Sequence, residues 1–157
     1  MHHVEAEQIV EAPPEAVWAK YTDHVGWSRW AGLGKVTLER EGSPTKNGVG
    51  AIRVFNNGIK VREEVLSFEA PTRMTYRLVS GAFPLTNHLG TVLFEPHPKG
   101  TRVVWRCQFD SRLPFIGGLI EKSLKNLFSK TLSRLVRKGM SAEAGASGTA
   151  GTTSATA

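Results

Sequence analysis

The stretch that decides the fold is Gly117–Gly139, with the sequence GGLIEKSLKNLFSKTLSRLVRKG. Its large apolar residues recur at steps of three and four, which at 3.6 residues per turn places them on one broad stripe of an α-helix. These residues are Ile120, Leu124, Leu127, Phe128, Leu132, Leu135 and Val136. A helix of this length extends about 33 Å, which is enough to cross a small sheet. The stretch therefore predicts an amphipathic helix that needs one broad apolar partner.

Both ends of this predicted helix are marked in the sequence. Pro114 and the Gly117–Gly118 pair precede it, and Gly139 suits the left-handed position after its last turn. Residues 117–140 carry six basic side chains and one acidic side chain, so they supply most of the net charge of +6. This basic face has two interpretations, a solvated outer surface or a transient contact with an anionic membrane surface. We expect no nucleic-acid partner, because the chain has no helix-turn-helix, RNP or zinc-finger pattern.

The composition suits a single domain, because 157 residues with 40% hydrophobic side chains are enough to fill one core. Cys107 is the only cysteine, which excludes an internal disulfide and a cysteine-based zinc cluster. No apolar run reaches about 18 residues and the first residues lack a signal-peptide pattern, so we expect a soluble cytoplasmic protein, monomeric or homodimeric. Residues 141–157 are small and polar, which predicts a disordered tail after a folded domain of residues 1–140.

The chain before the long helix has mainly the patterns of β-strands. A first strand at 3–11 is followed by two short helices, one starting at Pro14 and one capped by Thr22 or Asp23. Six further segments alternate apolar and polar residues, at 35–40, 51–55, 59–68, 73–80, 88–95 and 101–110. No helix separates them. We therefore predict an α+β fold in which a curved antiparallel sheet of seven strands packs around the C-terminal helix.

Four segments before that helix occur in an order that is typical of a known superfamily. They are EAPPEAVWAKYTDHVGWSRW (11–30), GVGAIRVF (48–55), REEVLSFEAPTRMTYRL (62–78) and GTRVVWRCQF (100–109). In this order they resemble the START-like, Bet v 1-like (SRPBCC) superfamily, and within it the polyketide cyclase/dehydrase-like group. The resemblance covers about residues 4–138 and implies a helix-grip fold that encloses a hydrophobic cavity for a lipid, polyketide or similar apolar molecule. It implies no particular chemistry, because the superfamily contains carriers, cyclases and lipid-transfer proteins.

Pleat alternation predicts which side chains line such a cavity. In the segment 59–68, Glu63 shares a face with Val61 and Val65 while the residues between them are charged, so Glu63 points inward. In the segment 88–95 the face of His88 competes with the face of Leu89, and we favour the His88 face. The predicted cavity residues are Trp27, Trp30, Arg53, Phe55, Val61, Glu63, Met74, Tyr76, Leu78, His88, Trp105, Phe109, Leu124, Leu127 and Phe128.

The partner of Glu63 depends on the turn that precedes its strand. A two-residue turn at Asn57–Gly58 places Ile52 and Val54 inside, whereas a three-residue turn at Asn56–Gly58 places Arg53 and its face inside. We favour the three-residue turn, because it brings Arg53 diagonally across from Glu63 and an unpaired buried carboxylate costs several kcal/mol. The resembling family also tends to have an arginine and a glutamate here. The pair is either a purely structural ion pair or part of a ligand site.

The two tryptophans of the second short helix, Trp27 and Trp30, also have two interpretations. They cover one mouth of the cavity, with the loop 81–87 at the other side, or they only fill the core. Cys107 alternates with aromatic residues and is therefore expected to be a packed, inert thiol. No serine nucleophile elbow, HExxH or Cys/His pair is present, so the sequence gives no sharp enzyme motif.

Three hypotheses about function follow. The leading one is a non-catalytic binder or carrier of a hydrophobic small molecule, without a metal or other cofactor. The second is a polyketide aromatase or cyclase, in which Glu63, Arg53, Tyr76 and His88 polarise a carbonyl and transfer a proton, with Glu63 and His88 as the catalytic candidates. The third is lipid transfer at a membrane surface through the basic helix.

Overall fold

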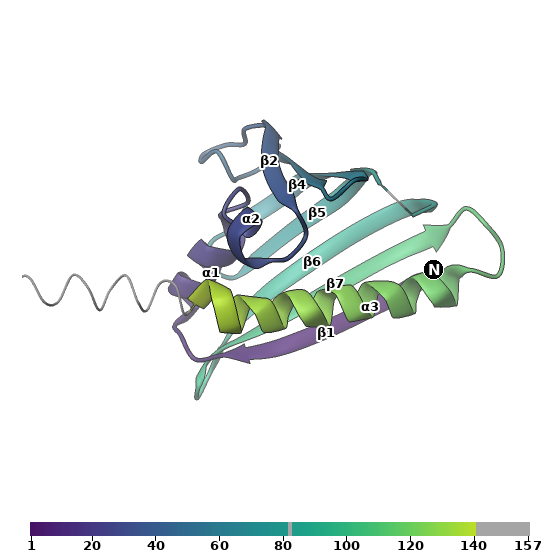
Figure 1. Ribbon diagram of the computed structural model, residues 1–157. Coiled ribbons are helices and arrows are strands. Elements are labelled where there is room, and N and C mark those ends of the chain that lie inside the picture. The colour runs from purple at the N-terminus through teal and green to yellow at the C-terminus, as the bar shows by residue number, and fades with distance from the viewer. Residues whose placement is uncertain (82, 141–157) are drawn as a thin grey trace, which may run out of the picture.

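The computed structural model describes residues 1–81 and 83–140 and contains one antiparallel sheet of seven strands beside a long helix (Figure 1). This confirms the predicted α+β helix-grip architecture, with two short helices after the first strand. The predicted tail at 141–157 lies outside the described residues and stays a prediction. The elements are β1 (His2–Val10), α1 (Pro14–Thr22), α2 (Trp27–Trp30), β2 (Lys35–Arg40), β3 (Ile52–Asn56), β4 (Lys60–Glu69), β5 (Arg73–Ser80), β6 (Leu85–His97), β7 (Gly100–Ser111), α3 (Gly117–Arg134) and the π-helical η1 (Leu135–Met140).

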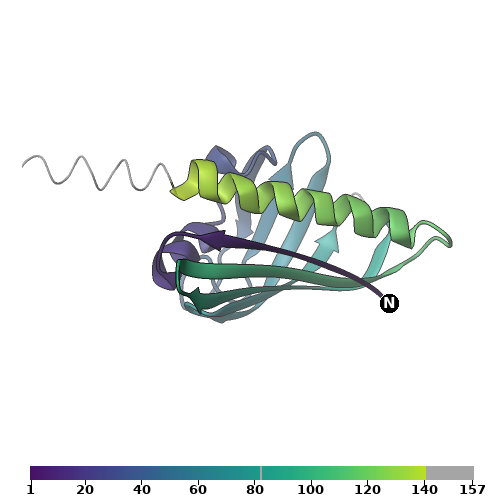
Figure 2. The same ribbon diagram turned by 90° about the horizontal axis from the view of Figure 1, so that it is seen from below.

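The strand order is β1-β7-β6-β5-β4-β3-β2, so the chain meanders from β2 to β7 and β1 adds to the outer edge of β7. Figure 2 shows α3 lying along one side of the curved sheet. The start of β1 is attached to this helix, because His2 Nδ1 lies 2.7 Å from Glu121 Oε1. The helix is therefore held at the β1 side of the sheet, where it packs on β1 and β7.

The apolar stripe, which runs from α3 into η1, is buried as its spacing predicts. Its half-buried member Leu127 contributes to the cavity described below, and Val136 packs against the core from η1. On the opposite side Lys122, Lys125 and Lys130 are exposed. The residues at most 7% exposed are Ile120, Leu124, Phe128, Leu132 and Leu135.

The end of the C-terminal helix differs from the prediction. The chain continues from α3 into η1, and Gly139 is not among the glycines with a positive φ, so it does not form a left-handed cap. Instead Gly139 is buried, and a Cβ built on it would lie 3.2 Å from Leu135 Cδ1 and 3.5 Å from the Trp30 ring. This glycine therefore allows η1 to pack closely against Trp30.

Two other segments are shorter than predicted. The second short helix covers only Trp27–Trp30, while Asp23 Oδ1 accepts a hydrogen bond of 3.3 Å from Gly26 N in the turn before it. The loop predicted at 81–87 ends early, because β6 already begins at Leu85. Within residues 1–81 and 83–140, no helix is long and apolar enough to cross a membrane.

The apolar stripe, which runs from α3 into η1, gives a direct test of the packing. Leu135→Ala should lower the free energy of unfolding by about 2–5 kcal/mol, because it deletes a fully buried side chain from the core. Lys125→Ala, on the exposed side, should change it by no more than about 0.5 kcal/mol. Urea denaturation of both variants measures the difference, and equal losses would contradict the packing of this stripe.

Candidate functional site

An apolar cavity of about 190 Å³ lies between the sheet and α3. Its mouth is bordered by Ile59 and Phe83, which are 63% and 39% exposed. Pockets for drug-sized ligands have volumes of about 300–1,000 Å³, so this cavity suits a small molecule or one end of a longer molecule. The lining consists of Trp27, Leu33, Phe55, Asn57, Ile59, Val61, Glu63, Tyr76, Leu78, Phe83, Leu85, His88, Trp105, Leu124, Leu127 and Phe128.

Most of the predicted cavity residues belong to this lining, but Trp30, Arg53, Met74 and Phe109 do not. Met74 is fully buried within the core. Trp30 packs beside Trp27 with the ring centroids 5.0 Å apart, and Phe109 stacks on the His2 ring at 5.3 Å. Alternation correctly predicted that Arg53, Met74 and Phe109 point inward, and the short helix buries Trp30, but none of these four side chains reaches the cavity.

Five lining residues were absent from the predicted set: Leu33, Asn57, Ile59, Phe83 and Leu85. Phe83 and Leu85 lie in the segment 81–87, which the sequence predicts to be a loop at the mouth. Their apolar side chains could therefore have identified them as lining residues. Ile59 is the first residue of the predicted strand 59–68, but it lies in the turn before β4. Leu33 follows α2 outside any helix or strand, where no periodic pattern could identify it.

The register between β3 and β4 places Arg53 directly opposite Glu63. Asn56 pairs with Lys60, so the turn contains the three residues 57–59, with Gly58 at φ 89°. The predicted length, and therefore the predicted inward face of Arg53, is correct. The turn begins one residue later than expected, and this shift makes the pair direct rather than diagonal.

Arg53 is completely buried and its charge is compensated by Glu63. Its Nε donates a hydrogen bond of 3.0 Å to Glu63 Oε1, and its Nη2 lies 3.0 Å from the same oxygen as an ion pair without hydrogen-bond geometry. The guanidinium carbon also lies over the rings of Trp27, Phe55 and Tyr76, at 5.1, 5.3 and 4.8 Å. The three rings separate the cation from the cavity and stabilise it by cation–π contacts.

Behind Arg53 lies a buried histidine, His24, that no pattern in the sequence singled out. Its Nε2 lies 2.9 Å from the carbonyl oxygen of Asn47, so this nitrogen carries the proton and donates it. Its Nδ1 is then an acceptor at 3.4 Å from Arg53 Nη1. Burial and the neighbouring guanidinium lower the pKa of His24 to about 3, which keeps the ring neutral.

Glu63 connects this buried cluster to the cavity. Its side chain is 14% exposed and belongs to the lining, while Oε1 is held by Arg53. Among the described residues, no side chain or backbone group forms a hydrogen bond with Oε2. Burial raises the pKa of Glu63, whereas the adjacent guanidinium acts to lower it. We treat the pair as ionised, because a guanidinium does not lose its proton in proteins and would otherwise be buried without a counterion.

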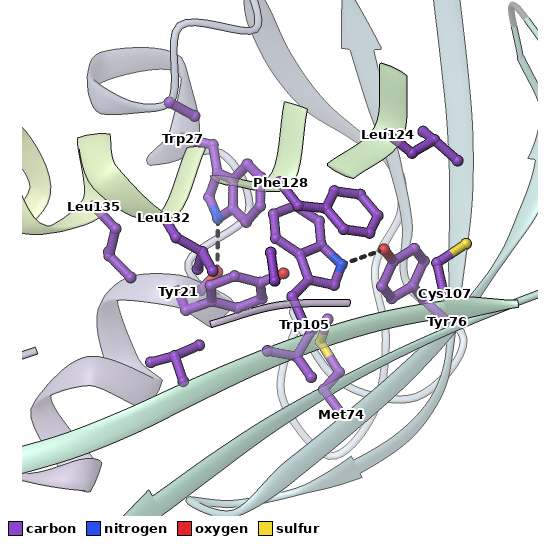
Figure 3. Packing of buried hydrophobic residues seen from close by; sticks show 14 of the residues in the cluster. Tyr21, Trp27, Met74, Tyr76, Trp105, Cys107, Leu124, Phe128, Leu132 and Leu135 are labelled. Atoms are coloured by element: carbon purple, nitrogen blue, oxygen red, sulfur yellow. Dashed lines mark hydrogen bonds between the residues drawn. The ribbon is translucent and has the colours of Figure 1, made fainter. Parts of the chain in front are cut away.

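Tyr76 is fixed from two sides, of which Figure 3 shows the hydrogen bond with Trp105. Trp105 Nε1 donates a hydrogen bond of 2.7 Å to Tyr76 Oη, so the tyrosine keeps its own hydroxyl proton to donate. The ring also lies on the backbone of β6, where a Cβ built on Gly90 would be 2.2 Å from its Cζ. Burial, together with Glu63, raises the pKa of Tyr76 well above its usual value, so the hydroxyl stays protonated.

His88 also lines the cavity, which agrees with the predicted choice of the His88 face. The register between β6 and β7 shifts between Thr86 and Leu89, and this irregularity carries His88. Leu78 N donates a hydrogen bond of 2.9 Å to His88 Nδ1, so the ring proton lies on Nε2. Burial and the charge of Arg53 lower the pKa of His88 to about 4, which makes it a neutral donor at pH 7.

The remaining titratable group of interest, Cys107, is a buried thiol. Burial raises its pKa to about 12, so it is not a thiolate nucleophile at neutral pH. Within the described part of the chain, no group of three or more His, Cys, Asp or Glu side chains is arranged to bind a metal ion. The polar chemistry of the cavity therefore rests on Glu63 as acceptor and on Tyr76 and His88 as donors.

Comparison with known proteins agrees with this architecture. The model of a family described as "Polyketide cyclase / dehydrase and lipid transport" matches residues 1–139. The chain belongs to this family. No curated protein matches it significantly.

Solved structures of this family's fold are similar over almost their full length. A structure from Thermobifida fusca has a TM-score of 0.74 at 25% identity, over 87% of this chain and 91% of that chain. A START superfamily protein from Mycobacterium smegmatis has a TM-score of 0.76 at 13% identity, over 90% and 99%. The protein XoxI from Bacillus cereus has a TM-score of 0.72 at 17% identity, over 91% and 99%. These similarities concern the fold.

The contact between Gly90 and Tyr76 can be tested by adding one methyl group. Gly90→Ala should lower the free energy of unfolding by about 1–3 kcal/mol, because the Tyr76 ring has to move and its bond with Trp105 is strained. Gly118→Ala is the control, since a Cβ there meets no atom within 4 Å and alanine favours the helix. Urea denaturation and the NMR shift of the Trp105 indole N–H report both effects, and an unchanged indole signal in Gly90→Ala would contradict this contact.

Proposed function

We propose that the protein binds a hydrophobic small molecule in this cavity and acts as a non-catalytic binder or carrier. The observation that carries the proposal is the lining itself, which is apolar and aromatic except for Asn57, Glu63, His88 and the tip of Tyr76. Such a combination of apolar wall and few polar groups is typical of sites that bind and orient small molecules. The family, whose description includes lipid transport, supports the same interpretation.

Filling the cavity tests this proposal. Leu127→Trp adds an indole to the lining from α3, so it should abolish binding of a neutral aromatic probe such as 2-methylnaphthalene. The free energy of unfolding should be kept or raised, as is common for cavity-filling changes. Lys125→Trp, on the exposed side of the same helix, is the matched control and should bind as the native protein does. Isothermal titration measures the affinities, and equal binding by both variants would place the ligand elsewhere.

A second candidate function is cyclisation or dehydration of a polyketide, which the arrangement of Glu63, Tyr76 and His88 favours. Two neutral donors and one carboxylate acceptor line the same apolar cavity, and such groups polarise a carbonyl and transfer a proton. Arg53 does not line the cavity, so its part is to hold and neutralise Glu63.

For a cyclase, His88→Gln should lower turnover of a linear polyketide mimic by about 10²–10⁴, the usual effect of removing a general acid or base. Its affinity for the mimic should change little, because the apolar contacts remain. Thr86→Ala, an exposed position on the same strand, is the control. Chromatography of the products measures the turnover. If the native protein does not convert the mimic, a cyclase function is excluded for that substrate class.

A third candidate function is lipid transfer, which is favoured by an apolar tip beside the cavity mouth. Leu113, Phe115 and Leu119 are exposed where β7 leads into α3, and Phe115 is held at φ 68°. Arg112 N in this tip donates a hydrogen bond of 2.8 Å to Pro84 O, next to the Phe83 that borders the mouth. With the basic outer side of α3 beside it, the tip has the chemistry of a surface that inserts into an anionic bilayer.

Vesicle binding tests the apolar tip. Phe115→Ser combined with Leu119→Ser should weaken sedimentation with phosphatidylglycerol vesicles by about tenfold or more, because two exposed apolar side chains are removed. Val49→Ser is the control, since this exposed valine lies at the opposite end of β3 from the mouth. Native protein that fails to sediment with the vesicles would exclude the membrane function.

A further inference from the structure

The charges around the cavity are arranged in an unusual way for a site that would take a fatty acid or another carboxylate. Among the lining residues that the structure describes, Glu63 is the one charged side chain, and it is negative. The nearest cation, Arg53, is fully buried, bound to Glu63 Oε1, and separated from the cavity by three aromatic rings. A ligand in the cavity therefore meets the carboxylate and not the guanidinium.

The cavity would disfavour a carboxylate ligand for two reasons. The ligand anion would lie beside the negative Glu63, where like charges in an apolar environment repel strongly. It would also lose its hydration without gaining a cation, because Arg53 is already neutralised and His88 is a neutral ring.

A hydroxyl group matches the same surroundings. Glu63 Oε2 has no protein donor among the described residues and accepts an O–H, and a hydrogen bond to a charged acceptor is a strong one. His88 lines the same cavity, and its Nε2–H is a second group that can donate to a ligand oxygen, since its Nδ1 already accepts from Leu78 N. The small volume of the cavity leaves the remaining, apolar part of the molecule in contact with the aromatic wall.

We propose that the cavity selects uncharged ligands that carry a hydroxyl donor, such as an alcohol, phenol or enol, and discriminates against carboxylates. Glu63 is the specificity-determining residue, and Arg53 acts through it by fixing its position and charge. This inference rests on the proposed binding function, because it concerns the polar end of the same cavity.

Three ligands of similar shape test the selectivity separately from the binding of hydrophobic molecules on which it rests. 2-Methylnaphthalene measures apolar binding alone, 2-naphthol adds a hydroxyl, and 2-naphthoate adds a carboxylate at neutral pH. NMR titration of the native protein, following the indole N–H signals of Trp27 and Trp105 in the cavity wall, gives the three affinities. We expect 2-naphthol to bind about tenfold or more tightly than 2-methylnaphthalene, and 2-naphthoate to bind about tenfold or more weakly.

The outcomes are distinct. Equal affinity for 2-naphthol and 2-methylnaphthalene, or tighter binding of 2-naphthoate, would overturn the selectivity while leaving the binding function in place. Tighter binding of 2-naphthoate would also mean that the charge of Arg53 reaches the cavity. If none of the three ligands binds, the binding function fails for aromatic molecules of this size, and the selectivity proposed for it fails as well.

Variants then assign the selectivity to Glu63. Glu63→Gln should remove most of the discrimination against 2-naphthoate, whereas Thr86→Ala should leave all three affinities unchanged. Because Glu63→Gln leaves Arg53 without its counterion and can impair folding, a second variant replaces both charges by apolar side chains, Arg53→Met with Glu63→Met. Either variant that still prefers 2-naphthol over 2-naphthoate by the native ratio would show that Glu63 does not determine specificity.

Discussion

The buried guanidinium of Arg53 is the constraint on which the rest of this structure depends. A cation with no exposed surface needs a counterion, and Glu63 supplies it from the directly opposite position of the neighbouring strand. A slip of one residue between β3 and β4 would turn one of the two side chains to the outer face, so the ion pair and the apolar pattern favour the same register. The three-residue turn at 57–59 is the turn that permits this pairing.

The same cation organises the aromatic side chains between the sheet and α3. Trp27 and Tyr76 lie against the guanidinium, and each is fixed by a hydrogen bond, from Trp27 Nε1 to the Tyr21 carbonyl and from Trp105 to Tyr76 (Figure 3). Trp105 stacks in turn on Phe128 of α3, with the ring centroids 4.0 Å apart. A continuous set of contacts therefore links the ion pair to the helix, and the cavity is the space that these rings leave beside them.

The sequence predicted the parts that follow from periodicity. The apolar stripe of the C-terminal helix and the inward face of Glu63 repeat at fixed steps, so a single chain is enough to identify them. The face of His88 was one of two that alternation allowed, because the neighbouring face of Leu89 is also apolar. What it did not reveal depends on contacts between distant segments. His24 contacts Arg53 only because β3 places the two side chains together, although they lie far apart in the sequence. Gly139 allows close packing against Trp30 and does not cap a helix. Likewise, alternation shows that Arg53 points inward but not that three rings lie between it and the cavity.

Glu63 is both the counterion of Arg53 and a lining residue of the cavity, and this limits which substitutions the cavity can accept. One carboxylate oxygen neutralises Arg53, and the side chain also lines the cavity, so the charge that compensates the buried cation is also a charge of the cavity wall. A substitution that adapts the cavity to an anionic ligand would first leave a buried cation unpaired, which destabilises a protein by about 3–5 kcal/mol. Apolar lining positions such as Leu127 and Leu78 carry no such penalty. On this scaffold the size and shape of the ligand can therefore diverge more easily than the charge of its polar end.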